Sequence, residues 1–150
     1  MLIKYVMAVV MSFVLASTAM AAGSSSSSTQ PKDSYYDQGV KAVKSANYKK
    51  AVKLFNKVVA TNPTDADAWN YLGFSNRKLK KFDLALSSYQ RALAIDPKHR
   101  GANEYLGELY LQTDDLAKAK ERLNKLEDIC TFGCEEFDDL KAAITAYESN

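Results

Sequence analysis

The sequence contains few of the residues from which catalytic and metal sites are usually built. Its 150 residues include one histidine, two cysteines and one tryptophan. The histidine, His99, closely follows Pro97, so we expect a solvated loop residue rather than a general base or a metal ligand. The sequence has no glycine-rich phosphate loop and no nucleophile motif. We therefore expect a protein that is not an enzyme and that binds no cofactor.

The charge of the chain is nearly balanced, with a formal net charge of +2, which gives no support for nucleic-acid binding. Its distribution is uneven. Residues 32–100 contain 14 Lys and Arg against 6 Asp and Glu, whereas residues 101–150 contain 5 against 12. One interpretation is two solvated surfaces of opposite sign. The other is a basic end that meets an acidic partner or anionic lipid, or head-to-tail association of two copies.

The first residues have the pattern of a secretory signal. Lys4 is followed by an almost wholly apolar run over residues 5–15, and Ala19-Met20-Ala21 has the small-x-small pattern of a cleavage site. We therefore predict a signal peptide over residues 1–21. An uncleaved membrane anchor is the alternative, which the small polar residues of this stretch disfavour.

Cleavage there would leave a mature protein that begins at Ala22 and has no stable membrane insertion. Residues 22–31 are rich in serine and are predicted to form a flexible tether. We expect the mature protein to lie in the periplasm of a Gram-negative bacterium.

The rest of the chain repeats with a period of 34 residues, which indicates a stack of similar units that bury their apolar faces against their neighbours. Within each unit the apolar residues fall at helical spacing in two groups, so each unit is predicted to be a helix hairpin. Four columns define the register: Gly39, Gly73 and Gly107; Ala51, Ala85 and Ala119; Tyr48, Phe82 and Leu116; Phe55, Tyr89 and Leu123.

Residues 66–99 carry the clearest copy, and their pattern resembles the tetratricopeptide repeat (TPR) family. The matching positions are Trp69, Leu72, Gly73, Phe82, Ala85, Tyr89, Ala92 and Pro97. The resemblance implies an all-α fold, a right-handed superhelical stack of three helix hairpins over residues 32–65, 66–99 and 100–133. The sequence departs from the family pattern in the turn inside each hairpin, where the usual glycine is replaced by Ala46, Lys80 and Asp114.

Residues 134–150 are predicted to form a capping helix. Phe137, Leu140 and Ile144 continue the apolar spacing, but Lys141 stands where the repeats have glycine. A lysine there fits only if no further helix packs on that side, so the outer face should be polar. Acidic residues crowd the first turn, and we interpret them as favourable to the helix dipole.

The two cysteines, Cys130 and Cys134, are predicted to form a disulfide, because an even number of cysteines in an exported protein favours pairing. Residues four apart on an unbroken helix lie too far apart to be bridged, so the helix should break between them, with Gly133 in a left-handed conformation. The alternative function of the pair is thiol redox chemistry or copper handling.

The TPR resemblance also implies a concave groove lined by the first helix of each repeat, which would hold a protein or peptide partner. The family members that clamp a carboxyl terminus use a basic residue and then an asparagine where this chain has Tyr36 and Val40, which argues against that ligand. Tyr71 and Tyr105 lie beside the groove positions. The positions carried over from the family are Tyr36, Val40, Lys44, Asn70, Phe74, Arg77, Lys78, Glu104, Glu108 and Leu111. We expect a non-catalytic interaction module of the cell envelope, with Phe74 and Arg77 as the main contacts.

Overall fold

The computed structural model describes residues 32–149, and the all-α prediction is confirmed in this range. None of the helices in it has the length and apolar character needed to cross a membrane. The predicted signal peptide and tether lie outside the described residues. The helices are α1 (Lys32–Lys44), α2 (Tyr48–Thr61), α3 (Ala66–Lys78), α4 (Phe82–Ile95), α5 (Arg100–Gln112), α6 (Leu116–Ile129) and α7 (Glu135–Glu148).

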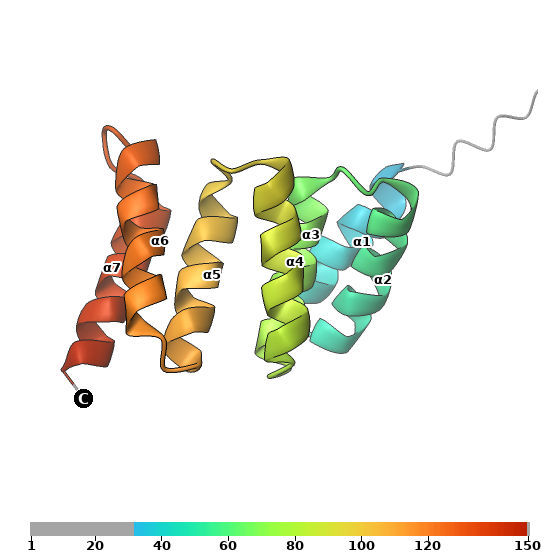
Figure 1. Ribbon diagram of the computed structural model, residues 1–150. Coiled ribbons are helices and arrows are strands. Elements are labelled where there is room, and N and C mark those ends of the chain that lie inside the picture. The colour runs from blue at the N-terminus through green and yellow to red at the C-terminus, as the bar shows by residue number, and fades with distance from the viewer. Residues whose placement is uncertain (1–31, 150) are drawn as a thin grey trace, which may run out of the picture.

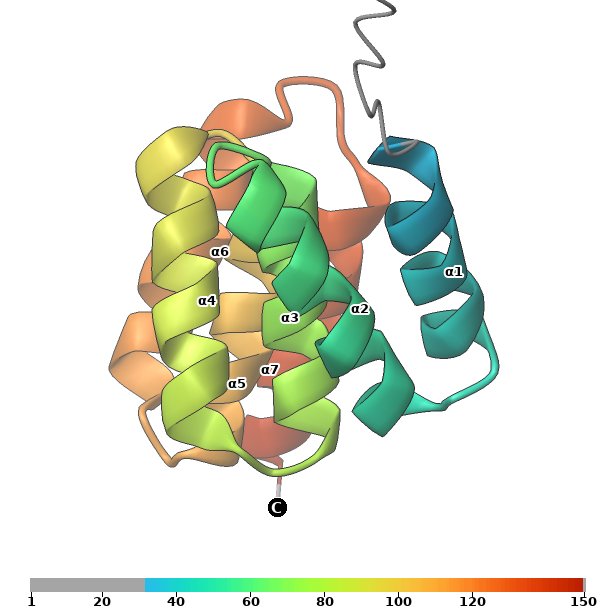
Figure 2. The ribbon, with the colours of Figure 1, turned by 90° about the vertical axis from the view of Figure 1, so that its right-hand side faces the viewer.

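The helices form a row of three antiparallel hairpins closed by a terminal helix, as predicted. Helices α1 and α2, α3 and α4, and α5 and α6 pair in chain order, and α7 packs against α5 and α6 (Figure 1). Viewed end-on, α4 and α6 lie on one side of the row, with α3 and α5 beside them and α1 on the opposite side (Figure 2). The first helices of the hairpins, together with α7, therefore form one face of the molecule.

The repeated glycines allow large side chains to lie directly against a helix backbone. A methyl group added at Gly73 would lie 2.6 Å from ring carbons of Tyr89, which is fully buried. At Gly39 the corresponding neighbour is Phe55, at 2.8 Å. Real side-chain carbons do not approach this closely, so each position requires glycine for packing, and the ring fills the space between the two helices of its own hairpin.

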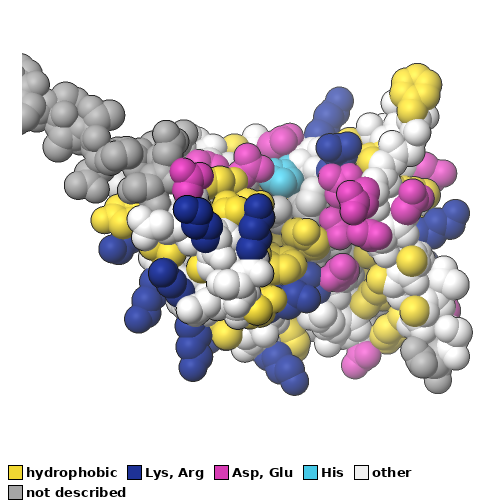
Figure 3. Space-filling view, turned by 180° about the vertical axis from the view of Figure 1, so that it is seen from behind, with side chains coloured by type: hydrophobic (Ala, Val, Ile, Leu, Met, Phe, Trp, Pro, Cys, Tyr) yellow, Lys and Arg dark blue, Asp and Glu magenta, His cyan; other side chains and the backbone are white. Residues whose placement is uncertain are grey.

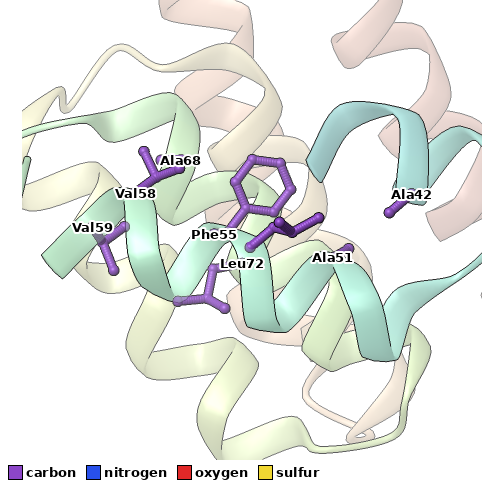
Figure 4. Packing of buried hydrophobic residues seen from close by; sticks show 8 residues of the cluster. Ala42, Ala51, Phe55, Val58, Val59, Ala68 and Leu72 are labelled. Atoms are coloured by element: carbon purple, nitrogen blue, oxygen red, sulfur yellow. The ribbon is translucent and has the colours of Figure 1, made fainter. Parts of the chain in front are cut away.

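The apolar core runs through the stack rather than through one hairpin. Around Phe55, side chains from α1, α2 and α3 form one cluster, so the first two hairpins share a core (Figure 4). A second cluster joins Tyr89 of α4 to Leu106 and Leu109 of α5. Burial between neighbours is what makes a repeat stack stable, because a single hairpin leaves its apolar face exposed.

The turns inside the three hairpins share one conformation although none contains glycine. Ala46, Lys80 and Asp114 all have a positive φ, between 55° and 59°. In each turn the following residue donates a backbone hydrogen bond to the carbonyl five residues earlier, as in Lys81 N–H to Asn76 O at 2.9 Å. This is the Schellman arrangement that ends helices, and it usually has glycine at the left-handed position. A non-glycine residue there costs about 1–2 kcal/mol, which the rest of the hairpin must offset.

The loops between hairpins are fixed by hydrogen bonds from the next helix. Trp69 Nε1 donates to the carbonyl of Pro63 at 3.0 Å, and Asn103 Nδ2, 34 residues later, donates to that of Pro97 at 3.3 Å. His99 was expected to be solvated, and the structure corrects this. Its side chain is 12% exposed: Nδ1 accepts from the backbone N–H of Ala102, and Nε2 lies 3.1 Å from Asp67 Oδ1. The ring thus caps α5 and links it to α3.

The cysteine pair closes the turn before the terminal helix. Helix α6 ends at Ile129, and the Sγ atoms of Cys130 and Cys134 are bonded, with their Cα atoms 5.7 Å apart. Gly133 has a φ of 84°, so the break and the left-handed glycine occur where the spacing of the cysteines required them. In α7, Leu140 and Ile144 are buried and Lys141 is exposed. The outer side of this helix is therefore open to solvent, as a capping helix requires.

Candidate functional site

The face formed by α1, α3, α5 and α7 combines an apolar middle with charged ends. Figure 3 views the molecule from this side. Hydrophobic side chains gather near the middle, Lys and Arg side chains are spread over the half nearest the amino terminus, and Asp and Glu side chains cluster over the other half (Figure 3). The uneven distribution of charge along the chain thus becomes a gradient across one surface, and the candidate groove runs along it.

Aromatic rings from successive helices form the apolar part of this face. Tyr36 of α1 meets Tyr71 of α3 with ring centroids 5.9 Å apart, and Phe74 meets Tyr105 of α5 at 5.0 Å. Phe74 also contacts the ring of Tyr48 at 6.0 Å. Centroid distances of about 4.5–7 Å are those of interacting aromatic pairs. These rings are half-buried, so each keeps a surface that a partner could cover.

Burial raises the pKa of two tyrosine hydroxyls of this face. It raises the pKa of Tyr105 to about 12, and the carboxylates of Glu104 and Glu108 raise it further than Arg77 lowers it. The pKa of Tyr36 is likewise raised, first by burial and then by the charge of Asp67. Both hydroxyls are protonated at physiological pH, as an unperturbed tyrosine with a pKa of about 10 already is, and can donate a hydrogen bond to a bound segment.

Arg77 lies beneath this aromatic surface rather than on it, which corrects its predicted role as a direct contact. Its side chain is 2% exposed and forms an ion pair with Glu108 of α5. Its Nε atom donates to the hydroxyl of Tyr89 at 3.4 Å, and its guanidinium lies 5.5 Å from the ring centroids of both Phe74 and Tyr105. Arg77 is therefore a buried support for the two rings.

Two adjoining cavities extend along the face from α1 to α7. The larger, of about 450 Å³, lies between α1, α3 and the start of α5, and the smaller, of about 230 Å³, lies between α3, α5 and α7. Both are bordered by Asn70, Tyr71, Gly101 and Glu136. Because they share four residues, an extended segment could occupy both.

The remaining predicted groove residues divide into four groups. Lys44 and Lys78 are exposed, and the Lys78 ammonium lies 5.2 Å from the ring centroid of Phe74. Val40 is half-buried and packs against the first core cluster. Leu111 was predicted to line the groove, and the structure corrects this. It belongs to the core cluster that joins α5 to α6 and α7, because α7 covers the side of α5 that would otherwise face a partner. Asn70 and Glu104 are buried and line the cavities.

Several residues of the face were not predicted from the family positions. His99, Gly101 and Arg100 border the larger cavity, and Glu135, Glu136 and Asp139 of α7 border the smaller one. The acidic residues were interpreted as favourable to the helix dipole, and they also surround a cavity because α7 packs beside α5. The only signal in the sequence was the excess of acidic residues after residue 100.

Within the part of the chain that the structure describes, no group of three or more His, Cys, Asp or Glu side chains is arranged to hold a metal ion. Cys130 and Cys134 are both engaged in the disulfide, and Phe132 between them is fully exposed. The copper alternative for this pair has no group of three or more such side chains to support it in residues 32–149, and the redox alternative stays a prediction. The candidate site is therefore the groove and its cavities.

Comparison with known proteins matches one family model and several relatives to parts of this chain. The family described as tetratricopeptide repeat matches residues 66–99. Heat shock protein STI1 of Saccharomyces cerevisiae is 32% identical over 62% of this chain, which spans only 16% of that protein's length. An uncharacterized protein of Methanocaldococcus jannaschii is 32% identical over 47% of this chain and 81% of its own length.

Among solved structures, the type III secretion chaperone SycD of Yersinia enterocolitica, in complex with a peptide of the translocator YopD, has a TM-score of 0.70 and 22% identity. The alignment covers 81% of this chain and 92% of SycD. At that identity the likeness shows the fold, and the binding of a peptide is a property of SycD.

Proposed function

Because the chain belongs to the tetratricopeptide repeat family, we propose that it is a non-catalytic module that holds an extended segment of a partner protein along the face formed by α1, α3, α5 and α7. The observation that carries this proposal is the run of half-buried rings from Tyr36 to Tyr105 beside two adjoining cavities. Large aromatic side chains with one free surface are frequent anchors in protein interfaces. The peptide bound by SycD supports the same use of the fold.

The proposal predicts that Phe74→Ala weakens peptide binding about tenfold or more while the protein stays folded, because truncation of a central aromatic contact typically costs at least 1–2 kcal/mol. A random peptide library displayed on phage would be selected against the wild-type protein. The enriched peptides would then be synthesised, and their affinities measured by fluorescence polarisation for wild type and variant.

The matched control is Leu84→Ala, since Leu84 is 54% exposed and belongs to α4, which is not one of the helices of the proposed face. This variant should bind the same peptides within about twofold of wild type. If Leu84→Ala weakens binding and Phe74→Ala does not, the peptides bind outside the proposed groove and the proposal is wrong. Arg77 is unsuitable for this test because it is buried under the rings.

We also propose that the protein works in the cell envelope, as an assembly factor for a larger complex. The features that support this location are the apolar run after Lys4, the small-x-small pattern at residues 19–21 and the pairing of Cys130 with Cys134. Disulfides persist in oxidising compartments such as the periplasm and are rare in the cytosol.

Processing provides the direct test of this location. When the full chain is expressed in a Gram-negative host, the periplasmic fraction should contain a protein whose first residue is Ala22, because signal peptidase cleaves after a small-x-small pattern. Amino-terminal sequencing and intact mass would be measured. Replacing Ala21 with a large residue should leave the precursor uncleaved. Recovery of a chain that still begins with Met1 in the membrane fraction would contradict the proposed location.

A further inference from the structure

Two polar side chains whose acceptor atoms have no partner within the described residues border the smaller cavity. Glu104 of α5 is 6% exposed, and its carboxyl group has no hydrogen bond or ion pair to any described residue. Asn70 of α3 is 7% exposed, and its Oδ1 atom is buried without a partner. An unpaired buried polar atom such as Asn70 Oδ1 costs about 1–3 kcal/mol, so it calls for an explanation in a native protein. A ligand that donates hydrogen bonds would supply the missing partners.

The carboxylates around Glu104 disfavour the negatively charged form of its side chain. Burial raises the pKa of Glu104 to about 8, and the carboxylates of Glu108, Asp139 and Glu136 raise it as well, while Arg77 lowers it. Arg77 is already paired with Glu108. The groups that face Glu104 come from three helices: Arg77 and Tyr71 of α3, Tyr105 and Glu108 of α5, and Glu135, Glu136 and Asp139 of α7. A cation in the cavity would relieve this repulsion.

The cavity suits a single side chain better than a whole small molecule. Its volume of about 230 Å³ is below the roughly 300–1,000 Å³ typical of ligand pockets. Tyr71 and Tyr105 border it, and aromatic faces attract a guanidinium more often than an ammonium. A hard metal cation would require several converging oxygens, and no such group occurs among the described residues.

We propose that this cavity, which we call the acidic pocket, binds the guanidinium of an arginine in the partner segment, through Glu104 and Asn70 within the acidic residues of α7. The inference rests on the proposed function, since it places the arginine in a segment that lies along the groove. A guanidinium carries several N–H donors and a permanent charge, and so can pair with a carboxylate and an amide oxygen at once. The segment would continue into the larger cavity towards α1.

The test uses the peptides selected on the wild-type protein, each synthesised with arginine and with citrulline, which has the same shape but no charge. We expect an arginine at a fixed position, and a loss of about tenfold or more when citrulline replaces it. With Glu104→Gln, the same replacement should cost less than about threefold, because the carboxylate that pairs with the charge is gone. Glu127→Gln, at an exposed position of α6, is the matched control and should behave as wild type.

The pH dependence gives a second readout that a purely structural role would not produce. The pKa of Glu104 is about 8, so at lower pH the bound guanidinium must displace a proton from its carboxyl group. The affinity should therefore rise several-fold from about pH 6 to pH 8 and then level off. Glu104→Gln should show no such rise. Calorimetry at neutral pH in buffers of different ionisation enthalpy should show proton release on binding to wild type and none on binding to the variant.

The outcomes separate this inference from the proposed function. Peptides that depend on Phe74 but lack arginine, or that bind equally with citrulline, would overturn the acidic pocket and leave the groove intact. An equal loss with citrulline in wild type and in Glu104→Gln would also overturn it. Peptides whose affinity is unchanged by Phe74→Ala would refute the proposed function itself.

Discussion

Replacing Arg77 with alanine is expected to lower the free energy of unfolding by about 3–5 kcal/mol, as removal of one partner from a buried ion pair usually does. The change leaves the carboxylate of Glu108 without its cation and the hydroxyl of Tyr89 without its donor. It also removes the guanidinium that lies beside the rings of Phe74 and Tyr105. The measurement is urea denaturation followed by circular dichroism, at a pH near neutrality.

A neighbouring cation provides the control for this prediction. Lys78 is exposed on the same helix, and its ammonium also lies near the ring of Phe74. Lys78→Ala should change the stability by less than about 1 kcal/mol, because exposed cation–π contacts contribute little. The double variant Arg77→Met/Glu108→Gln should lose less than the sum of its single variants, since it removes both charges of one pair. Equal midpoints for Arg77→Ala and Lys78→Ala would show that Arg77 is not a structural support.

The position of Arg77 shows where prediction from the repeat pattern ends. The period of 34 residues predicted three hairpins and a terminal helix, because columns of small and large residues recur in register. The same register placed Arg77 one turn after Phe74 on a helix that faces the groove. Its burial depends on a carboxylate of the next repeat, Glu108, and on Tyr89 of the paired helix. Helical periodicity describes one helix at a time and contains no information about these partners.

The candidate site could be predicted only in part, because helical periodicity does not show which helices pack side by side. Tyr36 borders the larger cavity and Phe74 meets the ring of Tyr105 of α5, although their role as contacts of a partner stays a prediction. The acidic pocket was not predicted, because it forms between Glu104 and the first turn of α7, two segments whose separation depends on how the terminal helix packs. The excess of acidic residues indicated a charged end of the molecule, but it could not distinguish an exposed helix end from the wall of a cavity.

The third hairpin departs from the repeat pattern because the terminal helix packs against it. The register placed Leu123 opposite Gly107, as Phe55 lies opposite Gly39 and Tyr89 opposite Gly73. In the structure the closest neighbour of Gly107 is Leu140 of α7, which would lie 2.5 Å from an added methyl group. Leu140 is fully buried, whereas Leu123 is only partly buried. The terminal helix thus occupies the space over the glycine.

We therefore expect Leu140→Ala to lower the free energy of unfolding by about 3 kcal/mol, within the range for a leucine truncated in a well-packed core. The removed atoms lie against the backbone at Gly107, and a helix backbone cannot collapse into the space left behind. Urea denaturation would measure the loss, and hydrogen exchange should show the largest increase in amide exchange in α7, because a terminal unit of a stack opens most easily.

The comparison that decides this assignment is Leu123→Ala. If Leu123 filled the space over Gly107, as the repeat register predicts, its truncation should cost at least as much as that of Leu140. The structure instead predicts a smaller loss, of about 1 kcal/mol, because part of the Leu123 side chain already contacts solvent. Equal losses for the two variants, or a larger one for Leu123→Ala, would mean that the third hairpin packs like the other two. Helix α7 would then be a loosely attached cap, and the wall that it contributes to the acidic pocket would be lost.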